Sequence, residues 1–304
     1  MILLKKIISK IKFITITLIN LDEKLDEIKI NQGVILSKIN EKVKSKDIKN
    51  YEFKIFSQWG DDGIIQHLIN SVDIKNKTFI EFGIEDFSES NCRFLLMKDN
   101  WKGFVIDGSS SNVKKLKNNY FYWKYNLKAV CFFITKENIN DILLLSEFEK
   151  DLGILSIDLD GNDYYIIDAI KNFNPRIVVC EFNAVFGYKR KISVPYKIDF
   201  DRTKAHYSNL YFGASLAAMT FILNKKGYSL VGTNSAGNNA FFVRNDLIED
   251  NLEILTVKKA FTNSHFRESR DFKGNLSFIT DKNRIEKIKG LPVYEVEKKI
   301  VETL

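Results

Sequence analysis

Apolar residues recur at alternating steps of three and four along the first part of the chain. This 3.5-residue spacing, sustained over about five heptads, predicts a coiled-coil helix, so we expect residues 1–45 to form an oligomerisation segment. Isoleucine at most d positions favours a homotrimer or homotetramer over a parallel dimer. The alternative is an amphipathic helix that packs this apolar stripe on its own domain. The seam positions are Leu4, Ile7, Ile11, Ile14, Leu18, Leu21, Leu25, Ile28, Gln32, Ile35 and Ile39.

The pattern changes near residue 50, where short apolar runs begin to alternate with helical periodicity. Near-continuous apolar strands between helices imply a parallel sheet covered on both faces, hence an α/β fold for residues 50–304. Two later runs, 227–233 and 239–245, are separated by too few residues for a parallel return, so they predict a terminal antiparallel hairpin. A C-terminal extension follows and ends in a charged, helix-like stretch, 293–304. The parallel strands are predicted at 78–82, 103–107, 129–133, 153–159 and 176–182.

The turn after the first predicted strand is unusually acidic. A loop that holds phosphate needs several glycines so that backbone N–H groups can approach, and carboxylates repel phosphate. This turn has one glycine and lies where open α/β sheets bind ligands, so it favours a ligand with a cationic group, such as S-adenosylmethionine. Asp107 ends the next strand and can accept hydrogen bonds from both ribose hydroxyls; alternatively it caps the following helix. The residues of the turn that support this reading are Glu81, Gly83, Glu85, Asp86 and Glu89.

Polar residues also follow the fourth and fifth predicted strands. Asp158, Asp160, Glu181 and Asn183 should meet at one rim, because neighbouring parallel strands end side by side. One carboxylate could act as a general base towards a substrate hydroxyl. Asp158, Asp160 and Glu181 could instead hold a divalent cation such as Mg²⁺, or these acids could cap helices and turns.

A long loop, 184–212, follows the fifth predicted strand and is rich in tyrosine and basic residues. Loops of this length are usually functional or disordered, and this composition suits a sugar that carries phosphate or nucleotide. His206 is the only histidine in the loop, so it is an alternative general base, although a lone histidine is often an ordinary surface residue.

The net charge of +7 does not indicate a nucleic-acid partner, because the basic residues are scattered along a generally lysine-rich chain. Three cysteines without metal-type spacing predict buried, reduced thiols and a cytoplasmic compartment. Lysines interrupt the N-terminal apolar stretch, which excludes a transmembrane helix but allows peripheral contact with the inner face of a membrane. The cysteines are Cys92, Cys131 and Cys180, and the lysines are Lys5, Lys6, Lys10 and Lys12.

Five segments together resemble the class I S-adenosylmethionine-dependent methyltransferases, and in particular their FkbM-like relatives that modify sugars. The segments are SQWGDDGII, FIEFG, WKGFVIDG, LSIDLDGNDYYI and GASLAAM, which lie between residues 57 and 219. The resemblance implies a Rossmann-like seven-stranded methyltransferase sheet with S-adenosylmethionine as cofactor. It also implies methyl transfer to a hydroxyl, less readily an amine, of a saccharide or nucleotide-sugar acceptor in surface-glycan biosynthesis.

By the same resemblance, the cofactor residues lie in and after the first two strands, and the segment before the first strand closes over the cofactor. Two alternatives remain: an NAD-dependent oxidoreductase on the same sheet, and a non-catalytic oligomeric scaffold. The single glycine and the acidic turn count against the first, and the crowded carboxylates count against the second. The implied cofactor residues are Ser57, Gln58, Asp62, Glu81, Gly83, Asn91, Asp107 and Gly108.

Overall fold

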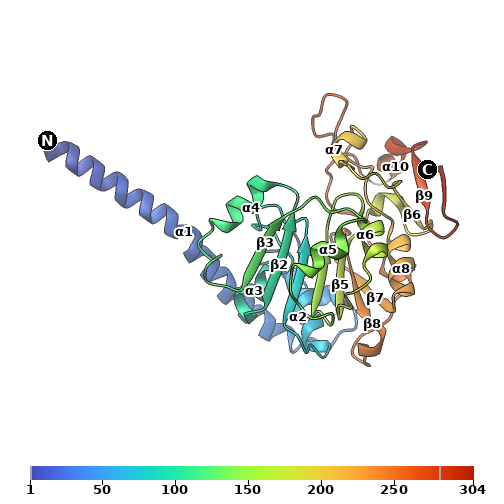
Figure 1. The fold of residues 1–304 in the computed structure, drawn as a ribbon, viewed down its shortest axis with the longest axis horizontal. Coiled ribbons are helices and arrows are strands. Elements are labelled where there is room, and N and C mark those ends of the chain that lie inside the picture. Colours follow the sequence, from blue (N-terminus) through green and yellow to red (C-terminus); the bar gives the residue numbers. More distant parts are fainter. Residues whose placement is uncertain (1, 281) are drawn as a thin grey trace.

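A seven-stranded sheet forms the centre of the computed structural model, which describes residues 2–280 and 282–304 (Figure 1). Its strand order is β3-β2-β1-β4-β5-β8-β7. The first five strands along the chain run parallel, whereas β8 is inserted between β5 and β7 and is antiparallel to both. The doubly wound sheet and its terminal hairpin are therefore confirmed. The strands are β1 Thr78–Phe82, β2 Lys102–Asp107, β3 Leu127–Cys131, β4 Ile154–Ile157, β5 Ile177–Glu181, β7 Tyr228–Thr233 and β8 Asn239–Arg244.

Helices cover both faces of this sheet, because alternate residues of each strand point to opposite layers. In β1, Phe79 packs in the layer of α2, α3 and α4, whereas Ile80 and Phe82 pack in the layer of α5, α6 and α8. All three residues are fully buried, so the parallel strands read as continuous apolar runs. The helices are α2 Asp61–Ser71, α3 Arg93–Asp99, α4 Ser110–Lys117, α5 Ile139–Leu144, α6 Asp163–Ala169 and α8 Leu216–Lys225, with shorter α7 Arg202–Ala205, α9 Val257–Ala260 and α10 Lys282–Ile288.

The C-terminal stretch differs from its prediction. Instead of a helix, residues 292–303 form a hairpin of β9 (Pro292–Glu295) and β10 (Ile300–Thr303), which pairs with the short β6 (Ile192–Ser193). Val293 and Glu295 are buried on one side of β9, which is the period of a strand. Their packing outweighs the helix propensity of the intervening Glu and Lys residues.

Helix α1 (Ile2–Asn40) is the long N-terminal helix that the sequence predicts. Its C-terminal half packs against α2 and α3, and its N-terminal half extends away from the sheet (Figure 1). The contact with the domain needs a glycine, since a Cβ at Gly33 would lie 2.4 Å from the Phe94 ring. Neither α1 nor any other helix within residues 2–280 and 282–304 is long and apolar enough to cross a membrane.

A buried ion pair fastens α1 to the domain. The Asp26 carboxylate contacts the Arg93 guanidinium and accepts a hydrogen bond of 2.6 Å from the Tyr120 hydroxyl. The guanidinium lies over the Phe56 and Phe121 rings, 4.2 and 4.6 Å from their centroids. Both charged side chains are less than a tenth exposed, so Arg93 depends on Asp26 for compensation, whereas Asp26 also lies 3.8 Å from the ammonium of Lys29.

The three cysteines are free thiols. Cys92 and Cys180 are buried, as expected, but Cys131 is exposed at the end of β3. The prediction was wrong for Cys131 because the strand stops there, at the edge of the sheet where the next residues enter a loop.

Removal of the Asp26 carboxylate should therefore destabilise the protein. We expect Asp26→Ala to lower the free energy of unfolding by about 3–5 kcal/mol, because it leaves the Arg93 charge buried without its partner. Urea unfolding measures this change. Glu27→Ala, one residue along on the exposed side of α1, should change stability by less than about 0.5 kcal/mol. An equal loss in both variants would contradict the role of the pair.

Candidate functional site

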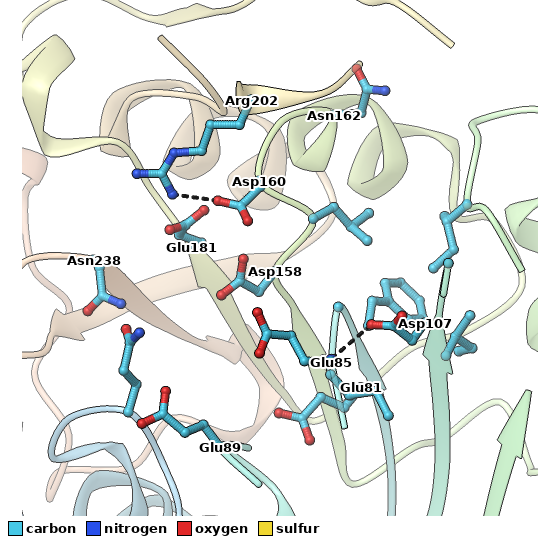
Figure 2. A pocket seen from close by; sticks show the side chains of 18 of the residues that line it. Glu81, Glu85, Glu89, Asp107, Asp158, Asp160, Asn162, Glu181, Arg202 and Asn238 are labelled. Carbon is cyan, nitrogen blue, oxygen red and sulfur yellow. Dashed lines mark hydrogen bonds and ion pairs between the residues drawn. The ribbon is translucent and has the colours of Figure 1, made fainter. Parts of the chain in front are cut away.

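A cavity of about 700 Å³ opens at the carboxyl ends of β1, β2, β4 and β5 (Figure 2). This is the edge at which open parallel sheets bind ligands. Its lining contains nine carboxylate side chains and one basic side chain, Arg202 of α7, so its charge is strongly negative when these acids ionise. The nine are Glu81, Glu85, Glu89, Asp107, Asp158, Asp160, Glu181, Asp201 and Glu268.

Glu81, at the start of the acidic turn, is hydrogen-bonded to the residues at its end. Its carboxylate accepts hydrogen bonds from the Ser90 hydroxyl at 2.5 Å and the Asn91 N–H at 2.8 Å. Burial raises the pKa of Glu81 to about 7 despite these hydrogen bonds. Glu81 thus lines the cavity as expected, but its oxygens are already engaged in holding residues 90 and 91 in place. The side chain of Asn91 also faces the cavity and donates to the Ser156 hydroxyl at 3.2 Å.

Gly83 follows β1 with a φ of +69°, and an added Cβ would lie 1.6 Å from the carbonyl oxygen of Asp158. No side chain fits that space, and the left-handed backbone favours glycine. The single glycine of the turn is therefore required where the β1 turn meets the β4 loop. This contact brings the acidic turn directly against the residues that follow β4.

Asp107 connects the acidic turn to the start of α4. Its carboxylate accepts hydrogen bonds from the Glu85 N–H at 2.8 Å and the Ser109 N–H at 2.7 Å (Figure 2). It also lines the cavity together with Gly108. Asp107 does not cap α4 as the alternative interpretation proposed, because the cap is Ser109, whose hydroxyl accepts from the Asn112 N–H; Asp107 remains at the cavity edge.

An apolar wall lies beside Asp107. Phe132, Phe133 and Ile134 line the cavity directly after β3. The sequence pattern placed both phenylalanines inside the strand, but β3 ends at Cys131, and 42% of Phe132 and 55% of Phe133 remain exposed. Two partly exposed aromatic rings next to a carboxylate offer a flat apolar surface and a hydrogen-bond acceptor to the same ligand.

The acids that follow β4 and β5 meet as predicted. One oxygen from each of Asp158, Asp160 and Glu181 lies within 4.8 Å of the others. Arg202 compensates part of this charge, since its Nη1 lies 2.7 Å from Asp160 Oδ1 (Figure 2). Glu181 is only 8% exposed, and none of the described residues donates a hydrogen bond or lies within ion-pair distance of its carboxylate.

Burial raises the pKa values of Asp158 and Glu181 well above the ordinary range; repulsion from Asp160 adds to the shift of Asp158, and repulsion from Asp158 adds to that of Glu181. The pair therefore favours either a bound proton or a bound cation between its carboxylates. The spacing also fits a metal: Mg²⁺ and Ca²⁺ bind oxygen ligands at about 2.0–2.6 Å, so ligands on one ion lie up to about 5 Å apart.

Four predicted site residues do not line the cavity. Asp62 is buried, where it accepts hydrogen bonds from the N–H groups of residues 55–57 and, at 2.7 Å, from the Ser57 hydroxyl. Neither Asp62 nor Ser57 therefore reaches a ligand, and α2 begins after Gly60 without a side-chain cap. Of that segment, Gln58 does line the cavity.

Asn183 and His206, predicted as catalytic, also lie outside the lining. The Asn183 amide donates to the carbonyl oxygens of Leu210 and Phe212, both at 2.9 Å, and so fixes the end of the long loop. His206 Nδ1 forms a hydrogen bond of 2.8 Å with the Ser208 hydroxyl. Both side chains thus organise the loop that carries Arg202.

Sequence reasoning missed the far end of the cavity. Trp59 and Phe266 lie there with ring centroids 6.3 Å apart and planes 25° apart. The cavity lining also includes amide and carboxylate groups, and Asn238 lies across the cavity from Asp107 (Figure 2); these groups belong to Asn209, Asn238, Asn239 and Glu268. Phe266 and Glu268 belong to a polar run whose pattern matches neither helix nor strand, so only their tertiary position reveals their role.

The buried acids generate a prediction on pH. In the folded protein the pKa values of Asp61 and Glu81 are raised to about 7 and that of Asp163 to about 6. Above the unfolded pKa values of 3.8 and 4.5 these groups hold protons that the unfolded chain has lost, so their stabilisation is complete below about pH 3.8 and is lost as the pH rises through about 7. We expect the urea midpoint to fall over this interval.

A matched pair of variants tests the cause. Glu181→Gln removes the unfavourable free energy of keeping this buried carboxyl either charged or protonated at pH 7, at nearly constant shape, and should stabilise the protein by on the order of 1–2 kcal/mol. Glu249→Gln, at an exposed position, should leave stability nearly unchanged. A destabilised Glu181→Gln protein would show that this carboxylate is compensated in the native state.

No family model matches the sequence, and no match is found among curated proteins. Solved structures that resemble the fold include the N-terminal domain of EvdMO1 with SAH and D-fucose, at 8% identity and a TM-score of 0.39, covering 71% of this chain and 94% of that one. An S-adenosylmethionine-dependent methyltransferase from Clostridium acetobutylicum has 9% identity, a TM-score of 0.39, and coverage of 68% and 94%. The fibrillarin pre-rRNA processing protein of Methanococcus jannaschii has 11% identity, a TM-score of 0.40, and coverage of 67% and 86%. Similarity this low assigns neither a family nor an activity to the chain.

Proposed function

We propose that the protein transfers a methyl group from S-adenosylmethionine to a hydroxyl, less readily an amine, of a saccharide. The observation that carries the proposal is the charge of the cavity, with nine carboxylates against one guanidinium at the ligand edge of the sheet. Such a cavity repels the pyrophosphate of a dinucleotide and attracts a sulfonium. The position of Asp107 beside an aromatic wall supports an adenosine group at the same edge.

The donor would lie along β1, β2 and β3. In this arrangement Phe132 and Phe133 would hold the adenine, Asp107 would accept hydrogen bonds from the ribose hydroxyls, and the acids beyond Gly83 would attract the sulfonium. Asp158 and Glu181 line the same cavity and would lie nearer the acceptor. The proposal thus assigns one end of the cavity to each substrate.

The acceptor would occupy the end formed by Trp59 and Phe266. Aromatic rings pack on the C–H faces of a sugar, while the surrounding amides and carboxylates bind its hydroxyls. Among the residues that the structure describes, Arg202 is the only basic side chain that lines the cavity, and it already pairs with Asp160, so a nucleotide-linked acceptor would keep its diphosphate outside. The sugar itself is therefore the part that the cavity would recognise.

In the reaction, the methyl carbon moves from sulfur to the acceptor oxygen as the S–C bond breaks and the O–C bond forms. The hydroxyl proton would pass to whichever of Asp158 and Glu181 is ionised, because a raised pKa makes that carboxylate a stronger proton acceptor. Most of the remaining barrier reduction comes from holding donor and acceptor in line. A divalent cation held by Asp158, Asp160 and Glu181 would bind the hydroxyl and lower its pKa.

Calorimetric titration with S-adenosylmethionine, S-adenosylhomocysteine and NAD tests the cofactor. We expect the first two to bind and Asp107→Ala to weaken both at least about tenfold, because a hydrogen bond to a charged group contributes about 1.5–3 kcal/mol. Asp141→Ala, exposed on α5, is the matched control and should bind normally. Binding of NAD alone would identify an oxidoreductase instead, and binding of none would favour the non-catalytic scaffold.

The acid cluster is tested by turnover with a panel of saccharide acceptors. We expect Asp158→Asn and Asp160→Asn to lower kcat by about 10²–10⁴-fold while affinity for S-adenosylhomocysteine stays within a few-fold. Asp168→Asn, an exposed position on α6, should retain full activity. Loss of wild-type activity in EDTA, restored by Mg²⁺, would assign the cluster to a metal; unchanged activity would assign it to proton transfer. Full activity of both cluster variants would remove these acids from the mechanism.

A further inference from the structure

Helix α1 has two different faces, and only one of them meets the domain. The domain-facing stripe advances by four and three residues and is mostly small or polar. Besides the Asp26 pair, the Asn40 amide donates to the Tyr51 carbonyl at 2.6 Å, and Gly33 lets the helix approach Phe94. The stripe consists of Asp26, Ile30, Gly33, Ser37 and Asn40.

The apolar seam predicted from the sequence lies on the other face. At about 100° of rotation per residue, the seam residues between 21 and 39 point, on average, about 140° away from the domain-facing stripe around the helix axis. The seam residues beside the anchored half are 44–63% exposed, so the domain does not cover them. This arrangement contradicts the alternative in which α1 packs its apolar stripe on its own domain. The residues are Leu21, Leu25, Ile28, Ile35 and Ile39.

The same seam continues without a break into the half of α1 that extends from the domain (Figure 1). There Ile7, Ile11 and Ile14 are 47–58% exposed, while the side chains of Leu4 and Leu18 lie outside those that the structure describes. Burying the remaining exposed half of such a side chain contributes roughly 1 kcal/mol. Over the eight described apolar seam residues, this sum is large enough to drive association.

The spacing and the charges of the helix indicate another helix as the occupant. Beside the anchored half, the exposed large apolar side chains keep to the 3.5-residue seam, as helix pairing requires, whereas a lipid surface needs only a broad apolar arc. In the extending half, Ile8 and Phe13 are exposed as well. Acidic residues are interspersed along the anchored half, at Asp22, Glu23 and Glu27, which does not suit an anionic membrane. A second copy of the chain supplies an identical seam.

We propose that α1 packs in parallel with α1 of two or three further copies of this chain, through the seam, while each domain stays fastened to the opposite face. Isoleucine at Ile7, Ile14, Ile28 and Ile35, all d positions, favours three or four strands over two. Because the two faces are well separated around the helix, association leaves the Asp26–Arg93 pair intact. The assembly needs no ligand and does not depend on the activity proposed above.

Light scattering on the full-length protein tests the assembly. We expect a mass of three or four times 35.3 kDa for the wild type, and of one chain for Ile28→Lys, which places a charge in the seam. Asn20→Lys adds the same charge to an exposed position of α1 away from the seam and should keep the wild-type mass. Circular dichroism and urea unfolding verify that each variant remains folded.

Three outcomes would overturn the proposal: a monomeric wild type, a dimer, or an assembly that Ile28→Lys leaves unchanged. A monomer that sediments with anionic vesicles, and loses this binding in Ile28→Lys, would assign the seam to a membrane surface instead. Since mass is measured without substrate or cofactor, failure here is distinguishable from failure of the proposed methyl transfer.

Discussion

Repulsion between carboxylates is the constraint on which the ligand edge of the sheet depends. Nine acidic side chains line one cavity, and the surroundings accommodate their charge in different ways. Glu81 receives hydrogen bonds, Asp160 receives Arg202, and Asp158 and Glu181 favour protonation. The remaining repulsion between these carboxylates lowers the stability of the folded protein, and a cationic ligand can relieve it. Binding sites commonly lose stability in this way in exchange for function.

Much of the architecture was predictable from the sequence because it rests on local periodicity and on one topological rule. Apolar runs identify the strands, and parallel strands end at one edge, so Asp158, Asp160 and Glu181 were expected to meet there, as they do. The ends of strands were harder to predict. Phe132 lies outside β3 because the strand stops at Cys131, and no local sequence pattern marks that point. The C-terminal β9–β10 hairpin was mistaken for a helix because its burial depends on β6, a hundred residues away in the chain.

Residues drawn from distant sequence positions were the hardest to assign. Ser57 and Asp62 carry the polar chemistry of a site but bond to the backbone of their own segment instead. Trp59 and Phe266 come together only through the fold. Composition identifies which groups can do chemistry, whereas tertiary packing decides which of them remain available to a ligand.

Helix α1 is connected to the acidic turn, although the two are far apart along the sequence. Arg93, which holds Asp26, also donates hydrogen bonds to the carbonyl oxygens of Phe87 and Ser88, at 3.4 and 3.3 Å. The turn is therefore supported from outside the cavity as well as by Glu81 within it. A displacement of α1 and a ligand bound in the cavity would therefore both act on the backbone of the acidic turn.

The close approach at Gly83 also limits how this protein can diverge. Neither a larger side chain nor a shift of backbone is tolerated there without separating β1 from β4, so natural variation at position 83 should be almost nil even where neighbouring cavity residues drift. New substrate preferences would then arise at the far end of the cavity, among loop residues free to change. Under the proposed function, the end of the cavity that binds the methyl donor would then vary less than the end that binds the acceptor.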